Sequence, residues 1–231
     1  MSYPGVLALV MLFAGLDWLA VWQGRKRLEY LTKPAPLLAL IVWFALNHGF
    51  QGALVWAGAA LVFALVGDIL LMLPESRGFL AGLGAFLACH IAYLVALNPD
   101  GAAIDAGSLF VLAAVLGAGL VIFRPVERAV KARGSAVMLW AVRIYALVLS
   151  LVLATALAYL VRYITDPQEY SLTAALWLSA GASLFFLSDA LLAYDRFVSP
   201  RAGGRVLVHL TYHLGQIGLA LWPDASDTQL R

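Results

Sequence analysis

Two aspartates stand in similar apolar surroundings far apart in the chain. Residues 67–71 read Gly-Asp-Ile-Leu-Leu and residues 188–192 read Ser-Asp-Ala-Leu-Leu, so Asp68 and Asp189 occupy the same place in the two copies. Burial favours the protonated form of a carboxyl group, and two interacting carboxyls titrate in separate steps. One carboxyl can then donate a proton while the other accepts one. Asp68 and Asp189 are therefore our candidate catalytic residues, as an acid/base pair.

A histidine and a tyrosine follow each aspartate. The histidine comes 22 residues after the aspartate in the first copy (His90) and 20 residues after it in the second (His209). The tyrosine lies one helical turn further on and shares the face of the histidine. For His209 and His213 we favour hydrogen bonding between helices, which also competes with substrate binding for Tyr212 and Gln216. The predicted substrate-binding set on these faces is His90, Tyr93, Tyr212 and Gln216.

The aspartates could also have a structural role in helix packing, or they could be metal ligands. In the structural role, each carboxyl would hold two helices together through a hydrogen bond to a tyrosine or histidine. Aspartate and histidine also bind metals, but there is no His-Glu-x-x-His motif, and the single cysteine, Cys89, excludes a cysteine cluster. We therefore expect neither a metal nor a cofactor.

The composition identifies an integral membrane protein. Of the 231 residues, 63% are hydrophobic and 12% are charged, whereas soluble domains are roughly 45–50% apolar and about 25% charged. The mean hydropathy is +0.90. A net charge of +2 is too small to predict a nucleic-acid partner. The first residues lack the basic region of a cleavable signal peptide.

The hydropathy pattern predicts an all-α fold with eight transmembrane helices. Each needs about 20 mostly apolar residues, and the second helix is the shortest. We expect one transmembrane domain over residues 1–231. The predicted helices cover residues 5–22, 34–48, 52–73, 79–97, 106–123, 136–161, 172–193 and 204–222.

The basic residues predict the orientation in the membrane. Twelve of the fifteen Lys and Arg residues follow the first, third, fifth and seventh predicted helices. The positive-inside rule places those loops in the cytoplasm and both termini outside. A binding site for acidic lipid headgroups would also account for these residues. The protein is expected to be a multi-pass protein of the bacterial inner membrane.

The order of the motifs predicts an internal repeat. Asp68 falls on the third predicted helix and Asp189 on the seventh, and these two helices run in the same direction through the membrane. Residues 1–98 and 106–222 would then form two parallel four-helix repeats. We expect the two aspartates to face one central polar cavity.

Three further charged residues fall in or beside apolar segments. Lys33 precedes Pro34 at the start of the second predicted helix, where proline is well tolerated. Lys33 either reaches the membrane surface as an anchor or binds a substrate phosphate. Asp17 and Arg143 are expected to be buried, and the sequence does not decide their partners.

These motifs together resemble the lysoplasmalogenase (YhhN-like) family of integral membrane proteins. The resemblance includes both aspartate motifs, the Thr32-Lys33-Pro34 start of a helix and the pair Tyr212 and Gln216. It extends over nearly the whole chain. His213 departs from it, because an aromatic residue is expected there.

The resemblance implies a fold of eight transmembrane helices and hydrolysis of the vinyl ether bond of lysoplasmalogens. The products would be a fatty aldehyde and glycerophosphoethanolamine or glycerophosphocholine. Asp68 and Asp189 would be the conserved aspartates of the family. The implied partners are a lysophospholipid substrate and membrane lipid; the oligomeric state is not predicted.

Two other function classes fit the same residues. A small proton-coupled transporter of a lipid or amphiphile would also use buried carboxyls and repeated halves. A non-catalytic assembly protein would use the polar residues only to hold its helices together. Aldehyde release in detergent, where no compartments exist, distinguishes the enzyme from both.

Overall fold

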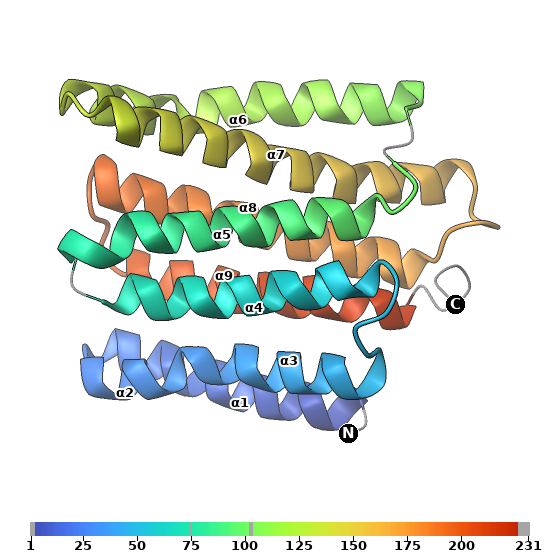
Figure 1. Ribbon diagram of the computed structural model, residues 1–231, viewed down its shortest axis with the longest axis horizontal. Coiled ribbons are helices and arrows are strands. Elements are labelled where there is room, and N and C mark those ends of the chain that lie inside the picture. The colour runs from blue at the N-terminus through green and yellow to red at the C-terminus, as the bar shows by residue number, and fades with distance from the viewer. Residues whose placement is uncertain (1–2, 74, 102–103, 226–231) are drawn as a thin grey trace. The chain divides into compact units, whose positions relative to one another are not determined.

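The computed structural model describes residues 3–73, 75–101 and 104–225, and these parts of the chain are helical apart from short connections (Figure 1). The chain divides into two compact units, Met1–Pro99 and Asp100–Arg231. The first unit contains α1 (Tyr3–Trp22), α2 (Lys26–Thr32), α3 (Pro34–Asn47), α4 (Leu54–Met72) and α5 (Glu75–Leu97). The second contains α6 (Ala106–Ala132), α7 (Ala136–Thr165), α8 (Leu172–Phe197) and α9 (Gly204–Ala225).

The predicted helices agree with the observed ones, with differences at the ends. The α5 helix begins at Glu75 rather than at residue 79, and α6 continues to Ala132 rather than ending at residue 123. The extension of α6 passes through Pro125, which removes one backbone donor. Arginine, glutamate and lysine favour helices, so Arg124, Arg128 and Lys131, which were expected in this loop, lie instead on the last turns of α6.

The sequence did not predict α2. This seven-residue helix contains basic residues that were expected in a loop. It is nearly continuous with α3, because Lys33 between them has helical dihedral angles (φ −61°, ψ −45°). Pro34 has no backbone N–H to donate, so the hydrogen-bond ladder is interrupted there.

Within the described residues, seven segments are long and apolar enough to cross a membrane, with α2 and α3 forming one segment, Lys26–Asn47. These segments comprise the helices from α1 to α8. The α9 helix is long enough but not apolar enough to be counted with them, because polar side chains such as His209, Thr211 and Gln216 interrupt its apolar sequence. Seven spans are supported in this way, and the eighth stays a prediction.

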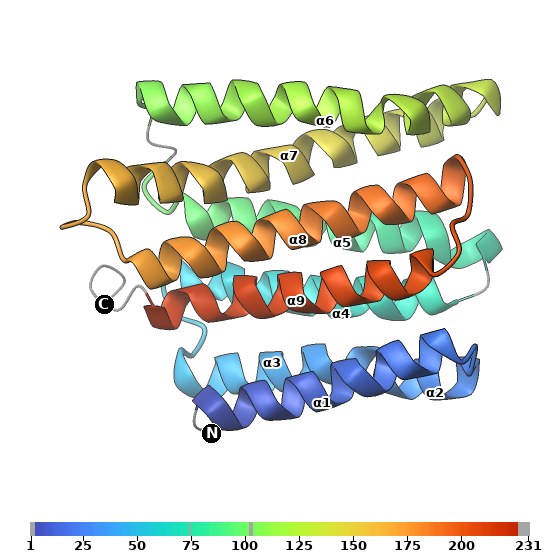
Figure 2. The ribbon, with the colours of Figure 1, turned by 180° about the vertical axis from the view of Figure 1, so that it is seen from behind.

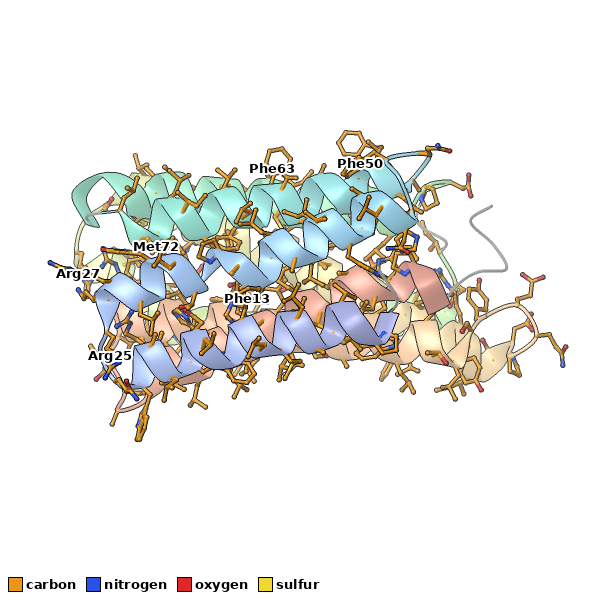
Figure 3. The ribbon with its side chains drawn as sticks, turned by 90° about the horizontal axis from the view of Figure 1, so that it is seen from below. Phe13, Arg25, Arg27, Phe50, Phe63 and Met72 are labelled. Atoms are coloured by element: carbon orange, nitrogen blue, oxygen red, sulfur yellow. The ribbon has the colours of Figure 1, made fainter. Side chains whose placement is uncertain are left out.

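The helices of the first unit pack largely in chain order. The α1 helix contacts α2 and α3, α3 contacts α4, and α4 contacts α5. In Figure 3, Arg25 and Arg27 lie at the same end of this unit as Met72, and Phe50 lies at the opposite end. Asp68 is one helical turn before Met72, so its carboxyl lies toward the end of this unit that carries Arg25 and Arg27.

The helices of the second unit form two close pairs, α6 with α7 and α8 with α9 (Figure 2). The α8–α9 pair is tightest where glycines meet. A Cβ added at Gly181 would lie 2.7 Å from the backbone nitrogen of Leu219, and one at Gly218 would lie 2.7 Å from the Cα of Gly181. Small residues allow such close approach of helix backbones.

Candidate functional site

Asp68 on α4 forms an ion pair with Lys33. The Lys33 Nζ lies 3.3 Å from Asp68 Oδ1, and the side chains are only 11% and 2% exposed. Lys33 stands between α2 and α3, and α3 contacts α4, so the packing of α3 against α4 brings the two side chains together. An ammonium group beside a carboxylate stabilises its negative charge. Lys33 is therefore in direct contact with the candidate catalytic residue.

The α5 helix packs closely beside Asp68. A Cβ added at Gly67 would lie 2.6 Å from the ring of Phe86 on α5. The lack of a side chain at Gly67, directly before Asp68, permits this close approach of the two helices. The helix that carries the His-x-x-Tyr motif therefore lies against the helix that carries Asp68.

His90 and Tyr93 on α5 are both fully buried, with exposed fractions of 1% and 0%. The His90 Nδ1 lies 2.6 Å from the carbonyl oxygen of Phe86, one turn earlier on the same helix. A carbonyl oxygen only accepts hydrogen bonds, so Nδ1 is the donor. This bond fixes the orientation of the imidazole ring.

Asp17 on α1 has a partner within the first unit. The Thr32 Oγ1, at the end of α2, donates to Asp17 Oδ1 at 3.2 Å. Asp17 is fully buried. Its contact residue, Thr32, is the immediate neighbour of Lys33, which the sequence alone did not indicate.

Asp189 on α8 accepts a hydrogen bond from a residue that sequence reasoning missed. The Tyr145 hydroxyl on α7 donates to Asp189 Oδ2 at 2.5 Å, and both side chains are buried. Tyr145 is 44 positions away and belongs to neither repeated motif. Its only signal in the sequence is a polar hydroxyl within an apolar helix.

Ser188, the neighbour of Asp189, connects the two motif helices of the second unit. Its Oγ donates to the carbonyl oxygen of Val208 on α9 at 3.0 Å. Val208 directly precedes His209. The Ser-Asp and His-x-x-Tyr motifs of this unit therefore lie on adjacent, hydrogen-bonded helices.

The polar face of α9 is buried and stacked. Tyr212 packs edge-on against Phe185 of α8 with ring centroids 5.6 Å apart, and the ring of His213 lies 5.4 Å from it. Gln216, one turn further, is 1% exposed. The rings of His209 and His213, four residues apart, lie 6.2 Å apart.

In the described part of the chain no three His, Cys, Asp or Glu side chains are grouped as metal ligands.

Arg143 is not buried, so that prediction was wrong. Its Nε donates to Glu127 Oε1 of α6 at 2.8 Å, and its guanidinium lies over the ring of Trp140. The Arg143 side chain is 41% exposed. The difference arises because Glu127 on the neighbouring helix balances the charge of Arg143 at this exposed position, so the guanidinium needs no partner in the interior.

Two of the basic residues counted for the topology bind the end of α8. Arg201 donates to Asp195 Oδ1 at 2.6 Å and to the carbonyl oxygen of Leu191 at 3.1 Å, and the Asp195 hydrogen bond raises the pKa of Arg201. Arg133 donates to the carbonyl oxygen of Phe197 at 3.0 Å. Basic side chains at a helix C-terminus satisfy its carbonyl groups. These two arginines therefore have structural partners within the second unit.

Comparison with known proteins adds sequence relatives but no fold template. A sequence model described as the YhhN family matches residues 28–222. Lysoplasmalogenase TMEM86B of Sus scrofa is 30% identical over 192 residues, which cover 83% of this chain and 73% of that protein. Lysoplasmalogenase TMEM86A of Homo sapiens is 28% identical over 196 residues, which cover 83% of this chain and 76% of that protein. No solved structure matches the chain.

Proposed function

Because the chain belongs to the YhhN family, we propose that it is a lysoplasmalogenase-like hydrolase that cleaves the vinyl ether bond of a lysoplasmalogen. The products are a fatty aldehyde and glycerophosphoethanolamine or glycerophosphocholine. The relatives named lysoplasmalogenase support this substrate class. The observation that carries the proposal is the pair of duplicated, buried aspartates, Asp68 and Asp189, each held by a side chain from another segment.

The chemistry of a vinyl ether requires an acid and a base. Protonation of the β-carbon of the double bond produces an oxocarbenium ion on the carbon attached to oxygen. Water then adds to that carbon and loses a proton, which gives a hemiacetal. The hemiacetal collapses to the aldehyde and the free hydroxyl of the glycerol. One water is consumed, and the proton that the acid supplies is balanced by the proton that water releases.

The partners of the two aspartates suggest how the roles divide. Lys33 stabilises a negative charge on Asp68, which suits the carboxylate that stabilises the cation and takes the proton from water. Tyr145 is a neutral donor, which permits Asp189 to carry the proton that it delivers to the substrate. Two carboxyl groups also take different roles in glycoside hydrolysis, where one donates a proton and the other acts as a carboxylate.

The substrate-binding roles belong to the same proposal. A lysine ammonium has three N–H donors, so Lys33 can hold Asp68 and also bind the substrate phosphate. His90, Tyr93, Tyr212 and Gln216 orient the polar part of the substrate. The alkenyl chain occupies the apolar part of the membrane. We place the enzyme in the bacterial inner membrane with both termini outside, and we retain eight spans in two four-helix repeats as part of the proposal.

The decisive experiment measures aldehyde release from a synthetic lysoplasmalogen by the purified, detergent-solubilised protein. We expect Asp68→Asn and Asp189→Asn each to lower kcat by about 10²–10⁴-fold, the usual contribution of a general acid or base. The assay is repeated with a chelator, and we expect no loss of activity. Asp100→Asn, the same change at an exposed aspartate between α5 and α6, is the matched control.

Each outcome has a clear meaning. Activity retained in one aspartate variant removes that residue from the chemistry. No aldehyde from a folded, monodisperse wild-type protein refutes the hydrolase, and flux into liposomes would then identify a carrier. Loss of activity with the chelator would require a metal that the proposal does not include.

A further inference from the structure

The α1 helix has a buried stripe with one carboxyl in it. Val6, Val10, Ala14 and Ala20 are all 0% exposed, and so is Asp17, which lies on the same face. Burying a carboxyl costs free energy that an apolar residue at the same place would avoid. The proposed reaction gives Asp17 no role, so a different role must account for this carboxyl.

Thr32 does not need Asp17 to satisfy its hydroxyl. The Thr32 hydroxyl lies 3.2 Å from Asp17 Oδ1 and also 2.9 Å from the carbonyl oxygen of Leu28 on its own helix. Back-bonding of threonine to the preceding turn is a common arrangement. Thr32 would therefore remain satisfied without Asp17. The contact between them links α1 to the end of α2 instead.

The contact between Asp17 and Thr32 lies at the junction of α2 and α3. Thr32 is the last residue of α2, Lys33 follows, and Pro34 begins α3. The Lys33 backbone N–H donates to the carbonyl oxygen of Glu29 at 2.9 Å, but Pro34 has no such donor, so the ladder that would hold this junction is incomplete. A side-chain contact from α1 at Thr32 restrains the backbone at the residue next to Lys33.

We propose that Asp17 is a positioning residue that holds Lys33 against Asp68 through the hydroxyl of Thr32. The links are Asp17 to Thr32 at 3.2 Å, one peptide unit, and Lys33 to Asp68 at 3.3 Å. The catalytic consequence rests on the proposed function, while the structural link does not. Asp17 precedes residues 28–222, the segment that the family sequence model matches.

The chain allows a direct test, because it has only three lysines, Lys26, Lys33 and Lys131. The purified protein is treated with an amine-reactive ester, and the modification rate of each lysine is measured by mass spectrometry. Lys26 and Lys131 are exposed and act as internal references. Lys33 is 11% exposed and paired, so it should react slowly in the wild-type protein.

Two matched pairs of variants remove or keep the hydrogen bond. Thr32→Val has nearly the shape of threonine without the hydroxyl, and Thr32→Ser keeps the hydroxyl. Asp17→Leu removes the acceptor, and Asp17→Asn keeps an acceptor oxygen. In Thr32→Val and Asp17→Leu we expect the modification rate of Lys33, relative to that of Lys131, to rise about tenfold. A tenfold change corresponds to an interaction energy within the usual range for residues of one hydrogen-bond network. In Thr32→Ser and Asp17→Asn it should stay at the wild-type value.

Kinetics supply a second readout. The kcat for aldehyde release should fall in Thr32→Val and be restored in Thr32→Ser. An unchanged Lys33 rate in folded Thr32→Val overturns the proposal, and this nearly isosteric variant decides the matter if Asp17→Leu does not fold. Wild-type protein without aldehyde release would refute the proposed function, whereas the lysine measurement would still test the positioning link.

Discussion

At the scale of single residues, Asp189 depends on a neutral donor. The hydroxyl of Tyr145 lies 2.5 Å from Asp189 Oδ2, and both side chains are buried within the second unit. A buried carboxyl needs hydrogen bonds to replace those that it loses from water. Tyr145 supplies one of them and fixes the direction in which the carboxyl points.

Tyr145→Phe tests this role. The change removes one hydroxyl and leaves the ring, so the α7–α8 packing should persist. We expect kcat for aldehyde release to fall by about 10–100-fold with little change in KM, because misplacing the proposed acid weakens the stabilisation of the transition state and not the binding of the substrate. The measurement is steady-state kinetics on the purified variant.

Tyr159→Phe is the matched control for that experiment. Tyr159 lies on the same helix, is only partly buried, and packs edge-on against Tyr170. An equal loss of kcat in both variants would mean that the hydroxyl of Tyr145 has no special role. A change in KM alone would point to substrate binding instead.

At the scale of helices, the α8–α9 pair depends on glycine. A Cβ at Gly215 would lie 2.8 Å from the backbone nitrogen of Phe185 and 3.1 Å from the carbonyl oxygen of Gly181. Backbone atoms cannot rotate away as a flexible side chain can. The hydrogen bond from Ser188 to Val208 requires the same close approach.

We therefore expect Gly215→Ala to destabilise the protein. Overpacking of a tight interface costs about 1–3 kcal/mol, which exceeds the gain of about 0.5–1 kcal/mol from replacing a helical glycine. Thermal unfolding in detergent measures the difference. Gly117→Ala on α6, where no atom lies within 4 Å of the added Cβ, is the control and should be neutral or stabilising.

The start of α6 has a cap that should respond to pH. Asp105 accepts hydrogen bonds from the Ser108 hydroxyl at 2.6 Å and the Ser108 backbone N–H at 2.8 Å, and Arg162 Nε of α7 lies 3.5 Å from its carboxylate. The hydrogen bond from the Ser108 hydroxyl is the main cause that lowers the pKa of Asp105 below its ordinary value of 3.8. The ionised carboxylate is thus the form that the folded protein stabilises.

The sign of the pH dependence follows from this lowered pKa. The contribution of the cap is fully present above pH 3.8 and is lost as the pH falls through the lower pKa of the folded protein. Hydrogen exchange at the first turn of α6, corrected for intrinsic rates, should show protection that falls in this acidic range. Asp105→Asn keeps a capping oxygen without the titration. The same acid response in that variant would contradict the assignment.

At the scale of the whole molecule, the number of spans decides the side of the C-terminus. The seven segments that are long and apolar enough to cross a membrane do not include α9, yet Leu219, Ala220 and Leu221 of α9 are all buried. Polar residues on a helix packed inside a membrane protein face its interior. We therefore keep the expectation that α9 spans the membrane.

Single-cysteine labelling tests this topology. Cys89 is the only cysteine in the sequence and is buried, so Cys89→Ala provides a background for new cysteines. With a membrane-impermeant maleimide on intact cells, we expect labelling of Gln168→Cys and Ser226→Cys. Gln23→Cys should react only after lysis. Labelling of Ser226→Cys only after lysis would mean that α9 does not cross the membrane.

The sequence by itself determined the membrane class and most of the helices. Long apolar runs are costly in water whatever their tertiary arrangement, so the segments could be read from hydropathy. It also singled out Asp68 and Asp189, because a charge in an apolar run is conspicuous without any structure. The short α2 escaped this reasoning, since its basic residues resemble those of a loop.

Only the tertiary structure decided which side chains meet. Lys33 pairs with Asp68, Tyr145 with Asp189, and Thr32 with Asp17, across separations that no local pattern encodes. It also placed Arg143 on an outer surface rather than in the interior. The physical reason is that hydropathy depends on each segment alone, whereas a hydrogen bond or ion pair depends on which segments pack together and in which register.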